Sequence, residues 1–169
     1  KSVKTEPINE NWFILKPINK TLTPQKEEKP NYRLAVIISC YNSEKFIEGK
    51  IENLIKQTIF NEAQLIFILS GTSKKEITLI QKLTKDYSNI KIIKTKKTET
   101  VYKAWNRGVK ASSSKYITNS NTDDRLSEDA LEIMCNELDN NSNISLIYAN
   151  CYITDDLNLT AGDYTTIVT

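Results

Sequence analysis

A run of four polar residues, Asn121-Thr122-Asp123-Asp124, follows the short apolar step Tyr116-Ile117. Two adjacent carboxylates beside amide and hydroxyl oxygens are the hard ligands that Mg²⁺ or Mn²⁺ takes, and such an ion can carry a phosphate group. The same residue types are also common in turns and helix caps. Ser127-Glu128-Asp129, just after the run, has the composition of a helix start. The run by itself therefore leaves both interpretations open.

Polar residues also follow two longer apolar runs of the chain. Ser39-Cys40-Tyr41-Asn42-Ser43-Glu44 comes after residues 34–38, and Ser70-Gly71-Thr72-Ser73 comes after residues 65–69. In open α/β sheets, ligands bind beyond the carboxyl ends of the strands. The three polar segments are therefore expected to share one crevice. The chain contains neither G-x-G-x-x-G nor the P-loop motif, which removes the main support for a dinucleotide or P-loop site.

Apolar runs alternate with helical stripes along most of the chain. Unbroken apolar runs such as 34–38 are typical of strands covered on both faces. A regular β/α alternation predicts an α/β fold, a doubly wound and mainly parallel sheet with helices on both faces. Strands are predicted at 34–38, 65–69, 90–93 and 115–118, with a fifth from 145–149; helices are predicted from about Ser43, from Ser73 with capping-box spacing to Glu76, and around 101–109 and 130–138.

The prolines mark a boundary near residue 32. All four of them precede residue 31, and residues 1–32 are predicted to form a linker or N-terminal arm. Residues 33–169 are predicted to form the folded domain. The first residue is Lys rather than Met, and the chain is therefore expected to be part of a larger multidomain protein.

Composition excludes several classes of function. The net charge is +2, and the lysines are scattered rather than clustered, which argues against nucleic acid as a partner. No apolar run reaches transmembrane length, and no signal peptide opens the sequence. The absence of histidine excludes a Ser-His-Asp or Cys-His enzyme and a His-based zinc site within these residues. Cys40, Cys135 and Cys151 lack metal-site spacing and are expected to be packed free thiols. They favour a reducing compartment, namely the cytoplasm or the cytoplasmic face of a membrane.

Five segments, in this order, resemble the family 2 glycosyltransferases of the GT-A fold. The resemblance covers about Leu34 to Ile153 and is specific because of the order and spacing of its weak individual motifs. The matching segments are Ala35–Asn42 (opening strand, V-S-V-I-I-P-T-Y-N), Gln57-Thr58 (Q-T/S at the end of the first helix), Gly71-Thr72-Ser73 (G-S-T), Tyr102–Gly108 (A-x-N-x-G) and Tyr116–Asp124 (the D-x-D strand).

The resemblance implies a site for a nucleotide-diphosphate sugar, with a UDP-sugar favoured. Cys40-Tyr41-Asn42 and Glu44 would hold the nucleoside, and Asp123 would carry Mn²⁺ or Mg²⁺ against the diphosphate. Asp124 would lie nearby for metal water or sugar hydroxyls. The remaining residues implied for donor binding are Ser39, Ser70, Gly71, Asn106, Arg107, Asn121 and Thr122.

Several of these residues also have purely structural interpretations. Tyr41 is also consistent with a packed aromatic, and Glu44 with a first-turn acid favoured by the helix dipole. Gly71 fits a turn glycine. Trp105, on the helix of the A-x-N-x-G segment, fits a core residue better than a stacking platform.

The chain departs from the family pattern at four points. Leu69 and Ser70 stand where relatives often place an Asp that contacts the base, Asn121 replaces the first Asp of D-x-D, and Trp105 replaces an Arg. In the family, the acceptor half with its catalytic base follows the D-x-D strand by some distance, and in this chain, which ends at Thr169, it is expected to be incomplete or missing. No catalytic base is therefore assigned.

Two functional hypotheses follow from the resemblance. The first is a metal-dependent transferase domain that passes the sugar to an acceptor hydroxyl with inversion; the acceptor, whether glycan, lipid-linked or protein, stays open. The second is a non-catalytic GT-A-like binding or scaffold module. A sugar-nucleotide nucleotidyltransferase ranks lower because Cys40 to Lys45 contains no glycine.

Overall fold

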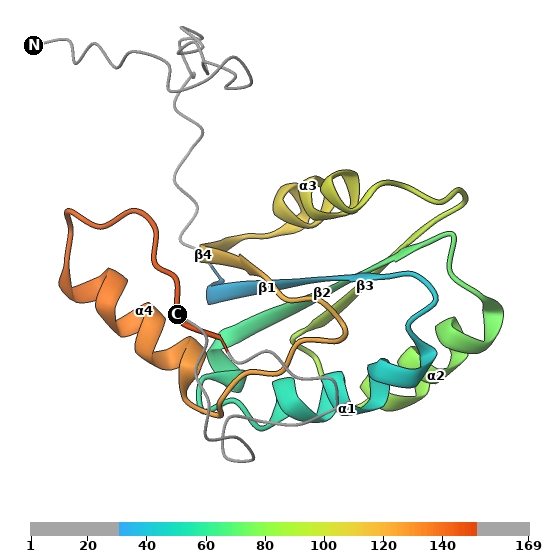
Figure 1. The fold of residues 1–169 in the computed structure, drawn as a ribbon, viewed down its shortest axis with the longest axis horizontal. Coiled ribbons are helices and arrows are strands. Elements are labelled where there is room, and N and C mark those ends of the chain that lie inside the picture. The colour runs from blue at the N-terminus through green and yellow to red at the C-terminus, as the bar shows by residue number, and fades with distance from the viewer. Residues whose placement is uncertain (1–30, 152–169) are drawn as a thin grey trace, which may run out of the picture.

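Four parallel strands form the centre of the molecule (Figure 1). The computed structural model describes residues 31–151. Its strands are β1 (Tyr32–Cys40), β2 (Ala63–Ser70), β3 (Ile90–Thr95) and β4 (Ser114–Asn119), in the order β3-β2-β1-β4. These elements confirm the α/β fold and the first four predicted strands. The predicted arm lies outside the described residues except for its last two positions.

Helices cover both faces of this sheet. The structure contains α1 (Glu44–Ile55), the short 3-10 helix η1 (Phe60–Glu62), α2 (Lys74–Thr84), α3 (Val101–Ala111) and α4 (Ala130–Asn140). Helices α1 and α2 lie on one face and α3 lies on the other (Figure 1). Helix α4 packs against the α1 side through the buried Leu131 and Cys135. This two-sided arrangement is the doubly wound architecture that the alternation of segments predicts.

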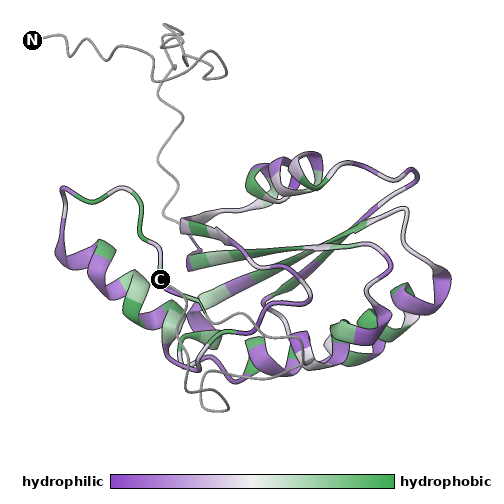
Figure 2. Cartoon of the chain, viewed as in Figure 1, coloured by the Kyte–Doolittle hydropathy of each residue, from purple (hydrophilic) through white to green (hydrophobic). Residues whose placement is uncertain are grey.

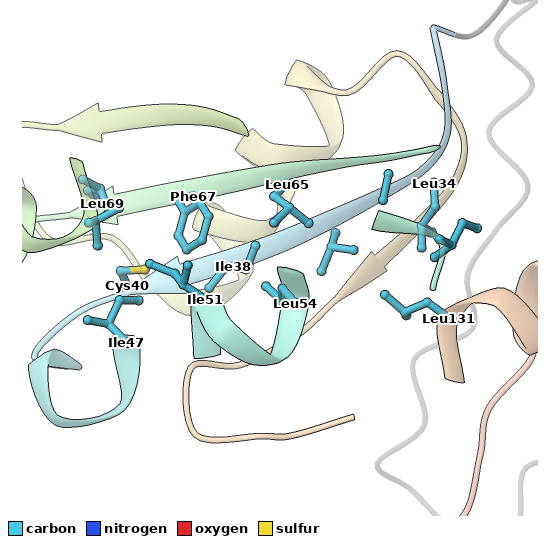
Figure 3. Close-up of a cluster of buried hydrophobic side chains, with 14 of the residues drawn as sticks. Leu34, Ile38, Cys40, Ile47, Ile51, Leu54, Leu65, Phe67, Leu69 and Leu131 are labelled. Carbon is cyan, nitrogen blue, oxygen red and sulfur yellow. The ribbon is translucent and has the colours of Figure 1, made fainter. Parts of the chain in front are cut away.

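The side chains of β1 divide between two hydrophobic clusters. Leu34, Val36 and Ile38 belong to the cluster that contains residues of α1 and α2, in which Figure 3 labels Leu34 and Ile38. Ala35 and Ile37 belong to the cluster under α3. Burial of one large apolar side chain contributes about 1.5–3 kcal/mol to stability. Because both faces of the strand are covered, it needs apolar residues at consecutive positions. The two central strands, β1 and β2, are accordingly rich in hydrophobic residues, whereas the helices are of mixed character (Figure 2).

Helix α3 approaches the sheet very closely. The buried residues of this helix are Ala104 and Gly108, one turn apart. A Cβ atom on Gly108 would lie 2.9 Å from Cγ1 of Ile37 and still closer to its Cγ2. Only a glycine therefore allows this approach, which gives the last residue of the A-x-N-x-G segment a packing role. Trp105 is half-buried against the same cluster, as expected of a core residue.

The strand order reverses beside β1, and this reversal determines where the candidate site lies. The chain passes from β1 to β2 and β3 on one side and then returns to β4 on the other. In the register, Cys40 pairs with Leu69, and Ile37 pairs with Asn119. The amide of Ser120 then donates to the carbonyl of Ile37 at 3.0 Å. The polar residues after β4 therefore start next to β1, at the reversal where open sheets bind ligands.

Two predictions about the C-terminal part are wrong. Residues 145–149 form no strand, and Leu146 and Tyr148 are 81% and 87% exposed. A cavity of about 330 Å³, lined by residues of β4, α4 and 145–147, lies between this segment and the sheet. The segment forms no strand because an apolar pattern alone does not supply a neighbouring strand to pair with. Cys151 is exposed rather than packed, while Cys40 and Cys135 are buried free thiols as expected. No helix in the described part of the chain is long and apolar enough to cross a membrane.

Candidate functional site

A cavity of about 360 Å³ opens at the carboxyl ends of β1, β2 and β4. It draws together residues from all three polar segments that the sequence singles out. Three further lining residues, Glu99, Val101 and Ala104, come from the start of α3 and the loop before it. The predicted site residues that line it are Ser39, Cys40, Tyr41, Ser70, Asn121, Thr122 and Asp123.

The other predicted site residues do not line this cavity. Glu44 accepts a hydrogen bond from the Ser73 hydroxyl at 2.7 Å, which agrees with a structural role at the helix start. That bond lowers the pKa of the Glu44 carboxyl. Arg107 pairs with a residue that does line the cavity. The residues outside the lining are Asn42, Glu44, Gly71, Asn106, Arg107 and Asp124.

The loop after β1 presents an aromatic ring at the edge of the cavity. The Thr72 hydroxyl donates to the carbonyl of Cys40 at 2.8 Å, which fixes the start of the loop. Asn42 has φ 53°, a left-handed conformation that asparagine adopts more readily than most residues. Tyr41, between them, is 55% exposed and is therefore not a packed aromatic. Its ring is available to a ligand.

Helices α1 and α2 cap each other beneath this loop. The Ser43 amide donates to Oε1 of Glu76 at 3.2 Å, and the Ser43 hydroxyl donates to the same oxygen. In return, Ser73, the N-cap residue of α2, donates to Glu44 of α1. The predicted capping box of α2 is half formed, because the Glu76 amide donates to the Ser73 hydroxyl at 3.1 Å while the Glu76 carboxylate turns to Ser43. Sequence reasoning missed this link between helices, since capping-box spacing predicts a contact within one helix.

Gly71 brings the loop after β2 against the loop before α3. Its φ is +62°, and a Cβ atom would lie 2.8 Å from the amide nitrogen of Thr98. Next to it, the Ser70 hydroxyl accepts the amide of Glu99 at 2.6 Å. Gly71 is thus a turn glycine that also permits a close approach. Together these contacts hold Glu99 at the cavity wall.

Glu99 supplies a carboxylate that sequence reasoning missed. Arg107, two turns along α3, donates to it through Nε at 3.1 Å and Nη2 at 2.5 Å. These hydrogen bonds lower the pKa of Glu99, so the side chain is charged. This chain lacks, at Leu69 and Ser70, the acid that the family pattern often has there, and Glu99 places a carboxylate in the same cavity. An acid directly before the A-x-N-x-G helix was the available signal.

The acidic loop, residues 121–124, exposes one carboxylate to the cavity. Asp123 is exposed and lines it, whereas Oδ2 of Asp124 accepts a hydrogen bond from the Asn121 amide at 3.0 Å. Within residues 31–151, no group of three or more acidic or Cys side chains is placed to hold a metal ion. Mg²⁺ characteristically binds through one or two carboxylates plus phosphate oxygens. The donor set therefore fits a Mg²⁺-like ion that shares its ligands with a bound phosphate.

Two cationic side chains fix the backbone of the acidic loop from beneath. Lys50 of α1 is buried, and its ammonium donates to the Ser120 hydroxyl at 2.5 Å and to the Asp124 carbonyl at 2.9 Å. Arg125 donates to the carbonyls of Thr122 at 2.8 Å and Asp124 at 2.7 Å. Burial lowers the pKa of Lys50 to about 8, against the opposing influence of the two Asp residues. Sequence reasoning missed Lys50, although a lysine among Ile47, Ile51 and Leu54 on the apolar helix face was a signal.

Comparison with known proteins settles the family. The family model described as glycosyl transferase family 2 matches residues 35–165, more than half of the chain. The chain belongs to glycosyl transferase family 2. This family 2 chain is 31% identical over 118 residues to the minor teichoic acid biosynthesis protein GgaB of Bacillus subtilis (strain 168), covering 69% of this chain and 13% of that protein. It is 24% identical over 135 residues to an uncharacterized glycosyltransferase of Haemophilus influenzae, covering 79% and 42%.

Solved structures share the family 2 fold at lower identity. S. aureus TarS 1-349, in complex with UDP-GlcNAc, superposes with a TM-score of 0.59 at 20% identity, covering 64% of this chain and 31% of that one. The mannosyltransferase PcManGT of Pyrobaculum calidifontis, in complex with GDP-Man and Mn²⁺, gives 0.55 at 15% identity, covering 64% and 32%. The chain therefore spans less than half the length of these relatives.

Proposed function

We propose that residues 33–169 form the donor-binding domain of a metal-dependent glycosyltransferase. The domain binds a nucleotide-diphosphate sugar, and the complete protein passes the sugar to an acceptor hydroxyl with inversion. One observation carries the proposal: the cavity at the strand reversal joins an exposed aromatic ring, a charged carboxylate and the acidic loop. Family membership makes an activated sugar the chemical class that fits this combination.

The nucleoside lies between the loop after β1 and the loop before α3. The exposed ring of Tyr41 stacks on the base, an interaction worth about 1–3 kcal/mol. The Glu99 carboxylate accepts a hydrogen bond from a base N–H. It thereby takes the role of the acid that is missing at Leu69 and Ser70. Uracil and guanine each carry a ring N–H, so this contact fits both UDP-sugars and GDP-sugars. The preference for a UDP-sugar rests on the family resemblance. The related structures TarS and PcManGT were solved with one donor of each type.

The diphosphate lies against the acidic loop. Asp123 holds Mn²⁺ or Mg²⁺, with Asp124 and Asn121 beside it. When bound, the ion offsets the negative charge that develops on the leaving nucleoside diphosphate. The chain's own contribution is to keep the loop backbone fixed through Lys50 and Arg125.

The buried thiols of Cys40 and Cys135 favour a reducing compartment, and we place the domain in the cytoplasm.

The second candidate is a binding module without catalysis. Two observations favour it: Asn121 is a neutral residue at the first position of D-x-D, and Asp124 is engaged by Asn121 instead of lining the cavity. Both hypotheses predict nucleotide binding, and only the first predicts turnover. Release of UDP from UDP-GlcNAc by the full-length protein, in the presence of Mn²⁺, distinguishes them. A full-length protein that binds the donor but releases no UDP supports the module.

Calorimetric titration tests the donor site directly. UDP and then GDP are titrated into the folded protein with and without Mn²⁺, and the titration is repeated on Asp123→Ala. We expect Mn²⁺-dependent binding that Asp123→Ala weakens at least about tenfold, or 1.4 kcal/mol. Asp86→Ala is the matched control, because Asp86 is exposed in the turn after α2 and away from the cavity. Binding of neither nucleotide by the folded wild-type protein would reject the donor site.

A further inference from the structure

We propose that Lys50 makes metal binding at the acidic loop depend on the bound diphosphate. The side chain does so by placing a fixed positive charge behind Asp123 and Asp124, where it opposes a cation that arrives alone. A diphosphate that arrives with the cation removes this opposition. The inference rests on the proposed donor site but concerns a residue that the family motifs do not contain. Lys50 acts through the loop and is a positioning residue.

The position of Lys50 is unusual for a lysine. The residue is completely buried on α1, among apolar neighbours that include Ile47, Ile51 and Leu54. Lysine is rarely fully buried unless it is paired, because its charge loses solvation. The ammonium has two hydrogen-bond partners, the Ser120 hydroxyl and the Asp124 carbonyl, and both belong to the segment after β4. Both hydrogen bonds of this buried charge therefore go to one short loop.

No carboxylate neutralises Lys50 by direct contact in the described part of the chain, where its two bonds go to a hydroxyl and a carbonyl. Both Asp123 and Asp124 nevertheless interact with the ammonium electrostatically. Arg125 adds a second positive charge at the same loop, bonded to the carbonyls of Thr122 and Asp124. Two cationic side chains therefore accompany two carboxylates, and the loop is close to neutral before any ion arrives.

This charge balance affects a divalent cation and a diphosphate in opposite ways. A cation at Asp123 meets two carboxylates but also the nearby charges of Lys50 and Arg125, and the buried charge of Lys50 is little screened by salt. A nucleoside diphosphate is attracted by the same two cations. The Asp124 carbonyl, which could otherwise serve as a metal ligand, already accepts from both cationic side chains. The geometry therefore disfavours the ion alone and favours the ion together with the phosphate.

Mn²⁺ binding measured by electron paramagnetic resonance tests the role of Lys50. The signal of free Mn²⁺ is followed during titration of the protein, first without nucleotide and then with saturating UDP. The variants are Lys50→Met, which is apolar, Lys50→Gln, which is neutral but keeps a donor, and Lys50→Arg, which keeps the charge. Lys56→Met is the matched control, because Lys56 follows the same helix but is exposed and paired with Glu52. Folding of each variant is checked by circular dichroism.

We expect wild-type protein, Lys50→Arg and Lys56→Met to bind Mn²⁺ weakly without UDP and much more tightly with it. Lys50→Met and Lys50→Gln are expected to bind Mn²⁺ without UDP roughly tenfold more tightly, a change that corresponds to about 1.4 kcal/mol. Nucleotide-free affinity that is unchanged or lower in both neutral variants would overturn the proposal and leave Lys50 a structural residue only.

Two arms keep the result interpretable. The nucleotide-free titration does not require UDP binding, so failure of the donor site and failure of the Lys50 proposal give different results. If the neutral variants do not fold, the wild-type protein still decides, because a ligand that binds only the folded state raises its stability by RT ln(1 + [L]/Kd). Mn²⁺ alone should then leave Tm unchanged, while Mn²⁺ with UDP raises it. Equal stabilisation by Mn²⁺ with and without UDP would overturn the proposal.

Discussion

One carboxylate oxygen of Glu76 accepts both the backbone amide and the hydroxyl of Ser43, the residue that precedes α1. Glu76 belongs to the first turn of α2 and is completely buried. The contact joins the starts of two helices that follow β1 and β2. Because the loop Cys40–Asn42 ends at Ser43, the contact also fixes the loop that carries Tyr41.

Replacement of Glu76 by alanine should destabilise the domain and weaken nucleotide binding. The substitution leaves a buried amide and hydroxyl without their acceptor, which costs about 1–3 kcal/mol. Urea unfolding measures the loss, and calorimetry with UDP measures the effect on the loop. Glu48→Ala is the control, because Glu48 is exposed on α1. Equal unfolding free energies for the two variants would show that the Ser43 contact contributes nothing.

Gly71→Ala should be destabilising because the site requires both a left-handed backbone and close approach. A non-glycine residue at φ +62° is strained by about 1–3 kcal/mol, and the added Cβ would crowd the backbone of Thr98. Thermal unfolding provides the measurement. Gly49→Ala is a control of opposite sign, because Gly49 lies inside α1, where alanine is favoured by about 1 kcal/mol. A Gly71→Ala protein as stable as the wild type would contradict the observed turn.

Asp139→Asn should weaken the contact between α4 and the edge of the sheet. The resulting loss of stability should depend on pH. Asp139 accepts hydrogen bonds from Lys115, from Tyr116 at 2.7 Å and from Arg33, whose Nη2 lies 2.7 Å away. These contacts, that of Lys115 first, hold the pKa of Asp139 well below its ordinary value of 3.8. A carboxyl with a depressed pKa stabilises the fold fully above its unfolded pKa and loses that contribution as the pH falls toward the folded value.

Unfolding of wild type and Asp139→Asn between pH 2 and 7 checks this linkage. The difference in stability should be constant from about pH 5 upward and shrink below about pH 4. Asp129→Asn, at the other end of the same helix, makes no side-chain capping bond and serves as the control. A difference that grows on acidification would have the wrong sign for this network.

The three thiols should differ sharply in reactivity. Cys151 is exposed, whereas Cys40 and Cys135 are buried. Burial raises the pKa of the Cys40 thiol, with Glu76 acting in the same direction, and so suppresses the reactive thiolate. Ellman's reagent should therefore titrate one thiol rapidly in the native protein and all three after denaturation. Cys151→Ser should abolish the rapid phase, and persistence of that phase would show that a buried cysteine is accessible.

The strands and helices around the site follow from local patterns. Short apolar runs such as residues 34–38 are typical of strands covered on both sides, and the β/α alternation then predicts a parallel sheet. The fifth strand was predicted by the same apolar pattern and is absent from residues 145–149. Apolar side chains specify burial, but a strand also needs a neighbour with free hydrogen-bonding groups. That neighbour is a property of the tertiary structure.

The site was predictable where its residues directly follow strands. Tyr41, Ser70 and Asp123 come from strand ends, and the structure places all three in one cavity; their roles in binding stay predictions. Glu99 and Lys50 were not predictable in the same way. Each reaches the site through a contact made across the fold, to Ser70 and to Ser120 respectively. Such contacts depend on the distance between elements, which local sequence does not encode.

The absence of a side chain at Gly108 has a practical consequence for redesign. Because the helix rests directly on Ile37 there, α3 has no room to roll or slide without a clash. Its first turn, which brings Val101 to the cavity wall, is thus held by an anchor two turns away. A library that varies Glu99 and Val101 would alter the size and polarity of the cavity on a frame that stays in place. Position 108 should be left out of any such library.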